Sequence, residues 1–394
     1  MSLPRYKEYK ASGVEWLGEV PGHWNLRSLR YAATIQNGSD FKDYEVSEGG
    51  YPVLGSGGEF ARISKFIYDQ PSVLLGRKGT IDNPLYIEEP FWTVDTLFYT
   101  KIAKDTHPKF FYWFCTSIPF GYFQFGSAVP SMTQNDLYGI KVPTPSLDEQ
   151  QTVAAFLDRE TGKIDALIAE QQRLMDFLTE KVTSLVLSSI CAPETQELRL
   201  ENAATIVSRP VIQREGQSYT PIGLFNRGRG SFHKDAREMA DMGDSDFFWL
   251  EEGDLIISGQ FAWEGAVALA GKEETGCVVS HRYPVLRGKS GITRTEYLLA
   301  LFSTKHGDFL LNENSRGAAG RNRPLNIKSL LKEKIPVVAM RTQEKIAEAV
   351  HSRNKLFAEI AKQVKLLNEH RSALISAAVT GKIDVRVPQL SEVT

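Results

Sequence analysis

Two long stretches of this chain carry the same pattern of residues about 193 positions apart. The stretches are residues 137–154 and residues 330–347, and each combines a proline-ended apolar run with the start of a helical pattern. Shorter echoes lie upstream, at residues 32–35 and 203–206, and at residues 111–117 and 297–303. A solenoid would repeat every 20 to 50 residues or so, and in more than two copies. The duplication predicts one globular domain plus one long helix, occurring twice with approximate two-fold internal symmetry.

Length and composition allow two ordinary hydrophobic cores. The chain has 394 residues, of which 42% are apolar and 24% charged, typical of globular proteins. It contains no apolar run long enough to span a membrane, and residues 1–7 lack the apolar core of a secretion signal. The three cysteines, Cys115, Cys191 and Cys277, are widely spaced without metal-ligand spacing. We expect reduced, mostly buried thiols in a cytoplasmic protein that does not engage a membrane.

The charge is unevenly distributed along the chain. A net charge of −2 argues against a uniformly basic nucleic-acid binder. Residues 205–237, however, carry six Arg or Lys against Glu215 and Asp235, and residues 316–334 carry six against Glu333 alone. Acidic residues gather instead within residues 241–254. Such clusters of cations favour local contact with an anionic partner.

The globular halves are predicted to be α+β domains with a mixed β-sheet and helices. Short apolar runs between Gly, Pro, Asn and Asp indicate strands. In the first half the predicted elements are strands at residues 72–75, 85–87 and 96–100 and a helix at residues 108–117. In the second half they are strands at residues 254–258 and 266–270 and a helix at residues 295–305.

Two long helices follow the globular halves. Residues 146–149 (Ser-Leu-Asp-Glu) have the pattern of a capping box, which begins the first helix. Apolar residues then follow a heptad track, at Val153, Leu157, Ile164, Leu167, Leu174, Leu178 and Leu185 in the first helix and at Ile346, Val350, Phe357, Ile360, Val364, Leu367 and Leu374 in the second. Each track is narrow and requires one partner, which the domain on the same half could also supply. The shared phase favours pairing of the helices with each other or with helices of another subunit.

Polar residues interrupt both tracks and suggest a register. Glu160 and Gln171 interrupt the first track, and Arg353 and Arg371 interrupt the second. If the helices form an antiparallel coiled coil about the internal two-fold axis, Glu160 faces Arg371. Opposite charges at that position would favour this register over a one-heptad slip.

No residue pattern indicates an active site or a bound cofactor. Residues 288–290 (Gly-Lys-Ser) resemble the end of a phosphate-binding loop, but Tyr283 stands where its first glycine should be. Residues 82–86 (Asp-Asn-Pro-Leu-Tyr) lack the second proline of an amino-methyltransferase signature. The histidines show no metal-ligand spacing. We therefore predict no catalytic residues, no metal and no cofactor.

Several loops carry side chains suited to DNA. Residues 76–79 (Gly-Arg-Lys-Gly) follow an apolar strand, although an ordinary hairpin turn would explain them too. The loops at residues 126–134 and 317–324 occupy matching places before each helical region. Arg, Asn and Gln hydrogen-bond base edges, and Arg and Lys neutralise phosphates. The predicted DNA contacts are Arg77, Lys78, Thr80, Trp92, Ser131, Thr133, Gln134, Arg209, Arg227, Arg229, Gln260, Trp263, His281, Arg282, Arg321, Asn322 and Arg323.

The landmarks together resemble the specificity subunit of type I restriction–modification systems, over nearly the whole chain. The most specific are residues 12–18 (Ser-Gly-Val-Glu-Trp-Leu-Gly) with Pro21 and Trp24, residues 143–154, and residues 378–384 (Ala-Val-Thr-Gly-Lys-Ile-Asp). The resemblance implies two target-recognition domains, each reading half of a bipartite site in double-stranded DNA. It implies that antiparallel helices hold the domains apart. It also implies that two methyltransferase (modification) subunits and the restriction subunits supply the catalysis.

The resemblance, together with the duplication, divides the chain as follows: residues 1–145 hold an N-terminal segment and the first recognition domain, 146–194 the first helical region, 195–336 the second domain, 337–385 the second helical region and 386–394 a tail. Recognition domains diverge within such a family, so the contacts proposed above come from loop position and side-chain chemistry. Two rival functions remain. One is a self-contained adenine methyltransferase, and the other is a coiled-coil scaffold that does not bind DNA.

Overall fold

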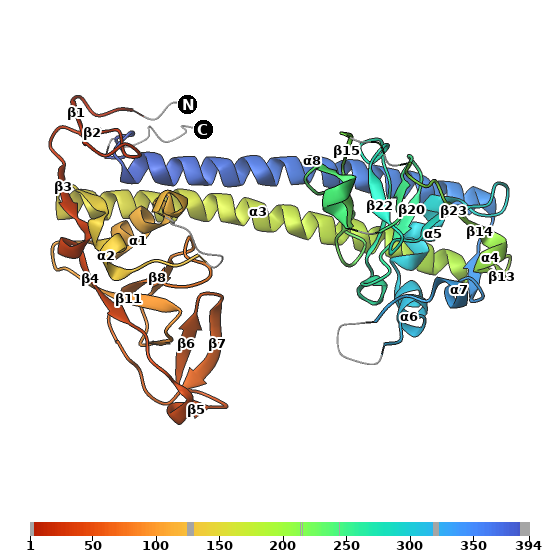
Figure 1. Cartoon of the computed structure of the whole chain (residues 1–394), viewed down its shortest axis with the longest axis horizontal. Helices are drawn as coiled ribbons and strands as arrows, with labels where there is room; N and C mark the ends of the chain where they lie inside the picture. The colour runs from red at the N-terminus through yellow and green to blue at the C-terminus, as the bar shows by residue number, and fades with distance from the viewer. Residues whose placement is uncertain are drawn as a thin grey trace, which may run out of the picture. The chain divides into compact units, whose positions relative to one another are not determined.

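A computed structural model describes residues 4–123, 130–212, 214, 216–243, 245–317 and 323–386 (Figure 1). The chain forms two compact units. Unit 1 combines Met1–Glu170 with Gln363–Thr394, and unit 2 is Gln171–Lys362. Two long helices, α3 (Leu147–Ile190) and α8 (Met340–Val379), contribute residues to both units.

Unit 1 contains two four-stranded sheets. In the first, the strand order is β4 (Ala33–Asn37), β11 (Leu97–Ile102), β8 (Ser72–Gly76) and β9 (Leu85–Ile87), and neighbouring strands are antiparallel. In the second, the order is β10 (Trp92–Thr93), β6 (Tyr51–Gly55), β7 (Gly58–Ile63) and β5 (Glu45–Val46). Two further pairs join β1 (Tyr9–Ala11) to β2 (Glu19–Pro21), and β3 (Asn25–Ser28) to β12 (Lys141–Thr144).

Short helices connect the first sheet to α3. Figure 1 shows α1 (Pro108–Thr116) and α2 (Gln134–Gly139) close to the start of α3, beside the sheet that contains β4, β11 and β8. The apolar side chains of α1 are buried because they lie in one core with residues of β8 and α3, and Phe111 and Phe114 are fully covered. The predicted helix at residues 108–117 and strands at 72–75, 85–87 and 96–100 are thus confirmed within two residues at each end.

Unit 2 repeats this arrangement. Its main sheet has the order β14 (Ala204–Ile206), β23 (Val285–Gly288), β20 (Leu255–Ile257) and β21 (Val267–Leu269), again antiparallel. The remaining strand pairs are β13 (Gln196–Arg199) with β24 (Lys334–Val337), β15 (Ser218–Tyr219) with β18 (Arg237–Glu238), β16 (Ile222–Leu224) with β17 (Ser231–His233), and β19 (Phe247–Trp249) with β22 (Val278–Ser280).

The helices of unit 2 correct one prediction. The predicted helix at residues 295–305 is two helices, α5 (Thr295–Phe302) and α6 (Lys305–Glu313). The break occurs because the Thr304 hydroxyl accepts a hydrogen bond from the Gly307 amide, which begins a new helix. The other helical segments are α4 (Leu200–Ala203), α7 (Ile327–Leu330) and the single 3₁₀ turns η1 (Leu29–Tyr31), η2 (Lys42–Tyr44), η3 (Phe120–Phe123), η4 (Met239–Met242) and η5 (Ala262–Glu264).

The internal repeat extends to individual hydrogen bonds. Gln150 and Gln343 stand at matching places near the start of α3 and α8, and both are buried. The Gln150 side chain donates to the Pro145 carbonyl at 3.0 Å and accepts from the His107 amide at 2.8 Å. The Gln343 side chain donates to the Val338 carbonyl at 2.8 Å and accepts from the Arg294 amide at 2.8 Å. Each glutamine joins its long helix to its own globular domain, so the predicted duplication is structural.

The expected capping box at the start of α3 is only half formed. The Ser146 hydroxyl accepts from the Glu149 amide at 3.3 Å, as predicted. The Glu149 carboxylate does not complete the box, because it is buried and bonded to the Tyr6 hydroxyl at 2.9 Å and the His23 ring at 3.0 Å. Arg386 approaches the same carboxylate at 3.6 Å. The glutamate therefore joins the two ends of the chain to α3.

The sequence landmarks at the two ends of the chain pack together in unit 1. The Asp384 amide donates to the Pro4 carbonyl at 2.8 Å, and Trp24 is fully buried. Gly381 has φ 75°, and a Cβ added there would lie 2.3 Å from the Pro21 ring. A larger residue would meet both a backbone conformation that disfavours side chains and a steric clash. The landmark residues 12–24 and 378–384 thus support one local structure.

The two long helices pack together within each unit. In unit 1, Leu157 and Ile164 of α3 share a core with Leu374 and Ala378 of α8. In unit 2, Val182 and Val186 of α3 share a core with Ile346 and Val350 of α8. The start of one helix therefore meets the end of the other in unit 1, and the reverse holds in unit 2, as an antiparallel pair requires. This confirms the predicted fold class.

Burial along α8 follows the predicted seam, whereas burial along α3 departs from it. Along α8 the covered positions include Val350, Phe357, Ile360, Val364, Leu367, Arg371 and Leu374. Along α3 the covered track is Leu157, Thr161, Ile164, Ile168, Gln171, Met175, Leu178 and Val182. Leu167 and Leu174 are instead 52% and 41% exposed. Every second position of the predicted track was placed one residue early, so that Thr161, Ile168 and Met175 occupy the seam in place of Glu160, Leu167 and Leu174. Gln171 lies in the seam, as expected.

The predicted pairing of Glu160 with Arg371 is also wrong. Arg371 forms an ion pair with Asp165 at 3.0 Å, and its guanidinium lies over the Trp113 ring. Glu160 instead contacts Arg159 at 2.7 Å and Lys163 at 3.1 Å on its own helix. The one-position shift of the α3 seam explains this, since Thr161 replaces Glu160 on the packed face.

Arg353 lies in the seam and is only 3% exposed. Its guanidinium contacts the Asn354 side chain and lies over the Phe357 ring. Burial lowers the pKa of Arg353 to about 10, because desolvation disfavours its charged form.

The cysteines follow expectation in part. Cys115 and Cys277 are buried and unpaired, while Cys191 is unpaired and exposed. Burial raises the pKa of the Cys115 thiol. Across the described parts of the chain, no helix has the length and apolar character needed to cross a membrane. In the same residues, no group of three or more His, Cys, Asp or Glu side chains could hold a metal ion.

Candidate nucleic-acid interface

Two predicted loops of unit 1 meet next to the first sheet. The loop after β8 and the segment before α2 are joined by a bridge between Lys78 and Ser131. The Met132 amide donates to the Arg77 carbonyl at 3.0 Å, and the Gly79 amide donates to the Pro130 carbonyl at 3.0 Å. Residues 126–129 of the second loop lie outside the described residues. We name residues 76–80 with 130–134 the first loop cluster.

Lys78 and Thr80 project from the first loop cluster into solvent. Lys78 pairs with Asp95 at 3.7 Å, but both side chains are more than half exposed, and such pairs contribute about 0–1 kcal/mol. The Lys78 amino group is therefore available to an anion. Arg77 is half-buried, with its guanidinium over the Phe98 ring and 3.4 Å from the Asp95 carbonyl.

The other predicted residues of unit 1 take different roles. Gln134 donates to the Asn37 side chain at 3.3 Å, which adds Asn37, an exposed amide that we had not predicted. Trp92 donates its indole N–H to the Ser39 carbonyl at 2.9 Å, two residues beyond Asn37. Thr133 begins α2, and its hydroxyl accepts from the Asp136 amide within a capping box. The hydroxyl of Thr133 is thereby committed to the helix.

Unit 2 brings its corresponding loops together by the same backbone contact. The Leu325 amide donates to the Gly259 carbonyl at 2.8 Å, which matches the contact between Met132 and Arg77 in unit 1. The Gly259 amide donates to the Arg282 carbonyl at 2.7 Å. The guanidinium of Arg323 lies 5.1 Å from the centre of the Trp263 ring. We name residues 226–229, 259–264, 281–282 and 323–325 the second loop cluster.

Arg227 stands at a tight turn of the second loop cluster. Its φ of 60° lies in the left-handed region, where only small residues are usually found. The turn is held because the Arg227 amide donates to the Glu264 carbonyl at 2.9 Å and the Gly228 amide donates to the Gly265 carbonyl at 2.8 Å. The Arg227 side chain is exposed, as is that of Arg229. Non-glycine residues in this conformation gather at functional sites, which supports Arg227 as a ligand contact.

Arg209 does not join the second loop cluster. Its guanidinium contacts the fully buried Asp254 carboxylate at 2.8 Å and Glu251 at 2.8 Å, and Arg287 contacts Asp254 at 2.6 Å. The hydrogen bond that Arg209 donates to the Asp254 carboxylate raises the pKa of Arg209. A guanidinium neutralised by two carboxylates stabilises the domain, so we remove Arg209 from the candidate contacts.

The remaining arginine-rich loop is described only in part. Arg321 and Asn322 lie outside the described residues. Arg323 is half-buried and donates to the Ser315 carbonyl at 3.2 Å and to the Asn312 side chain at 2.7 Å. Arg323 therefore positions its loop. Gln260, His281 and Arg282 are exposed beside it.

The first loop cluster combines an exposed cation, Lys78, with hydroxyls and the Gln134 amide, and the second combines exposed arginines with the Gln260 amide and the Trp263 ring. This mixture suits a polyanion whose backbone is bound by charge and whose bases are read by hydrogen bonds. Three cations of unit 2, Lys234, Arg237 and Arg282, line a cavity of ≈ 550 Å³ beside the second cluster. Only Arg282 of the three was predicted as a contact. Lys234 and Arg237 were noticed in the charge distribution, but no loop pattern singled them out.

A family model matches part of the chain. A family model described as the type I restriction modification DNA specificity domain matches residues 21–174. The matched segment spans the first domain and the first part of α3. No curated protein sequence matches the chain significantly.

Solved structures resemble most of the chain at low identity. The S subunit of a type I restriction–modification system from M. genitalium is 16% identical, with 91% of this chain and 96% of that chain covered and a TM-score of 0.50. A second structure, described as the structural basis of complex assembly and conformational transition of the type I R-M system, is 14% identical, with 91% of this chain and 98% of that chain covered and a TM-score of 0.49. A third, the HsdS subunit from Thermoanaerobacter tengcongensis, is 15% identical, with 92% of this chain and 98% of that chain covered and a TM-score of 0.39. At 16% identity the first likeness concerns the fold.

Residues 21–174 match the model of the type I restriction modification DNA specificity domain, so this segment of the chain is similar to that domain. This confirms the resemblance found in the sequence motifs. The matched segment supports a DNA specificity role.

Proposed function

We propose that this protein is the non-catalytic specificity subunit of a cytoplasmic type I restriction–modification complex. In the proposal, unit 1 reads one half of a bipartite double-stranded DNA site and unit 2 reads the other. The helices α3 and α8 hold the two reading domains and bind two methyltransferase subunits, which the restriction subunits join. Adenine methylation and DNA cleavage belong to those partners.

The matched loop clusters support this proposal most directly. Both clusters are held by an equivalent backbone hydrogen bond, from Met132 to Arg77 and from Leu325 to Gly259. Their side chains nevertheless differ, with Arg77 and Lys78 in one and Gln260 and Trp263 in the other. A common frame carrying different side chains suits two domains that recognise different base sequences.

The two rival functions make different predictions for the purified chain. A self-contained methyltransferase would bind S-adenosylmethionine, and a scaffold without DNA binding would leave the exposed loop cations without an anionic partner. We therefore expect the chain to bind its target DNA and not to bind S-adenosylmethionine.

Replacing Arg77 and Lys78 by alanine should weaken DNA binding about tenfold and lower the slope of log affinity against log salt by about 2, because each cation that meets a phosphate releases a counterion. The measurement is fluorescence anisotropy with target DNA at several salt concentrations. The Lys10→Ala, Lys104→Ala double variant removes the same charge from exposed positions elsewhere in unit 1 and is the control. Unchanged affinity and slope in the first variant would exclude this loop from the interface.

A further inference from the structure

A cavity of ≈ 550 Å³ lies in unit 2 beside the second loop cluster. Its walls come from β16, β18, β19 and β22 and from the segments next to these strands and after β17. Arg282 belongs to both the cavity and the loop cluster, since its carbonyl accepts from the Gly259 amide. The volume falls within the range of about 300–1,000 Å³ that is typical of small-molecule sites.

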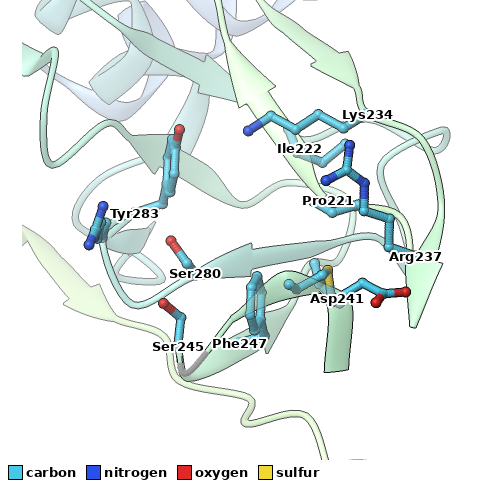
Figure 2. Close-up of a pocket in the computed structure, with 12 residues that line it drawn as sticks. Pro221, Ile222, Lys234, Arg237, Asp241, Ser245, Phe247, Ser280 and Tyr283 are labelled. Carbon is cyan, nitrogen blue, oxygen red and sulfur yellow. The ribbon is translucent and has the colours of Figure 1, made fainter. Parts of the chain in front are cut away.

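Three cations face this cavity, and no ion pair joins them to the part of the chain that the structure describes. Lys234, Arg237 and Arg282 are exposed, and none forms an ion pair with another described residue. One carboxylate, that of Asp241, also lines the cavity. In Figure 2, Lys234 extends its amino end toward the side of the cavity on which Tyr283 lies, and the Arg237 guanidinium lies close to Lys234. Positive charge therefore exceeds negative charge on these walls, as an anionic ligand requires.

Aromatic rings and hydroxyls complete the walls. The rings of Phe247 and Tyr283 are half-buried, and each packs against a small apolar cluster of the domain. Their remaining surfaces are left to the cavity. In Figure 2, Ser280 lies between these rings and Ser245 lies beside Phe247, and both supply hydrogen-bonding hydroxyls. Aromatic faces stack on nucleobases, and hydroxyls bond to their edges or to sugars.

We propose that this cavity binds one nucleoside phosphate unit, with its phosphate held by Lys234, Arg237 and Arg282 and its base against Tyr283 and Phe247. The favoured source is a single unstacked nucleotide of the DNA bound at the adjacent loop cluster, which rests on the proposed function. A free mononucleotide has the same chemistry and is the other source. A phosphate alone would use the cations but leave the aromatic part of the cavity unfilled.

The experiment uses the full chain with its methyltransferase partners and two probes. The first probe is target duplex that carries 2-aminopurine at successive positions of the half-site read by unit 2, because this base fluoresces more strongly when unstacked. The second probe is 2′-deoxyadenosine 5′-monophosphate, with binding measured by calorimetry. Three proteins are compared with the wild type: the double variant Lys234→Ala, Arg237→Ala; Tyr283→Leu; and the control Lys272→Ala, Lys345→Ala, which removes two exposed cations elsewhere in unit 2. Thermal melts verify that each variant is folded.

We expect a fluorescence rise at one position with the wild type and the control, and no rise with Tyr283→Leu. The Lys234, Arg237 variant should bind all DNA sequences about tenfold more weakly, with a salt slope lower by about 2. A second outcome is that the wild type binds the mononucleotide, both cavity variants lose this binding, and no 2-aminopurine position gives a fluorescence rise. That outcome would support the cavity as a nucleotide site whose ligand is a free mononucleotide.

The proposal would be overturned if both folded cavity variants bound DNA as tightly as the wild type and if no protein showed a fluorescence rise or bound the mononucleotide. That result would leave the DNA-reading function intact. Failure of the wild type to bind duplex at all would instead contradict the proposed function. The mononucleotide arm would then still decide whether the cavity is a nucleotide site.

Discussion

Exchanging residues 195–336 for the corresponding domain of a relative should change one half of the recognised DNA motif and leave the other half unchanged. The exchange is structurally reasonable because the segment enters and leaves through paired strands, with Glu197 of β13 opposite Pro336 of β24. The relative must preserve the apolar face that meets Val182, Val186, Ile346 and Val350 of the long helices. Sequencing of methylated adenines in a host expressing the hybrid with its methyltransferase would give the motif.

The matched control is the reciprocal exchange of residues 1–145, which should alter the opposite half. Changes in both halves from a single exchange would show that the domains do not read independently. An unchanged motif would mean that the exchanged domain does not select bases at all.

Inserting four residues between Glu170 and Gln171 of α3 should lengthen the gap between the half-sites by about one or two base pairs. Four residues add roughly 6 Å of helix at about 1.5 Å per residue, compared with roughly 3.4 Å per base-pair step. The insertion is close to one helical turn, so the seam residues Ile168 and Met175 stay nearly in phase. The expectation follows from the proposal that helix length sets the spacing of the two reading domains. Methylation mapping reads the gap directly.

A two-residue insertion at the same place is the control. It rotates the seam by about half a turn and should reduce stability and activity much more than four residues do. A folded, active four-residue variant with the original gap would place control of the spacing elsewhere, most simply in the methyltransferase subunits that grip the DNA.

The sequence predicted the repeated fold well because both copies carry local signals. The strands near residues 72–75 and 254–258 are short buried runs beside turn residues, and Gln150 and Gln343 mark the matching helix starts. Local sequence patterns did not predict features that depend on contacts between distant parts of the chain, such as which residues of a helix are packed. Thr161 replaces Glu160 on the packed face of α3, and Thr304 divides the expected helix at residues 295–305.

The candidate interface could be predicted by position but not by role. The loops around Arg77, Ser131, Gly259 and Leu325 do meet, as their matched places in the repeat suggested. An arginine is turned inward when it pairs with a buried carboxylate that lies far from it in the sequence. Asp254 lies 45 residues from Arg209 and neutralises it inside the domain, and no motif in the sequence marks that pairing. The cavity with Lys234 and Arg237 arises from four short strands and carries no sequence signature.

The central claim is that one chain reads two half-sites at a fixed distance. Single-molecule sequencing of the genome of a host that expresses the wild-type chain with its methyltransferase, compared with a host that expresses the methyltransferase alone, tests this claim most directly. We expect methylated adenines in a bipartite motif with a constant gap, only in the host that contains this chain. A single continuous motif, or the same methylation without the chain, would contradict the account.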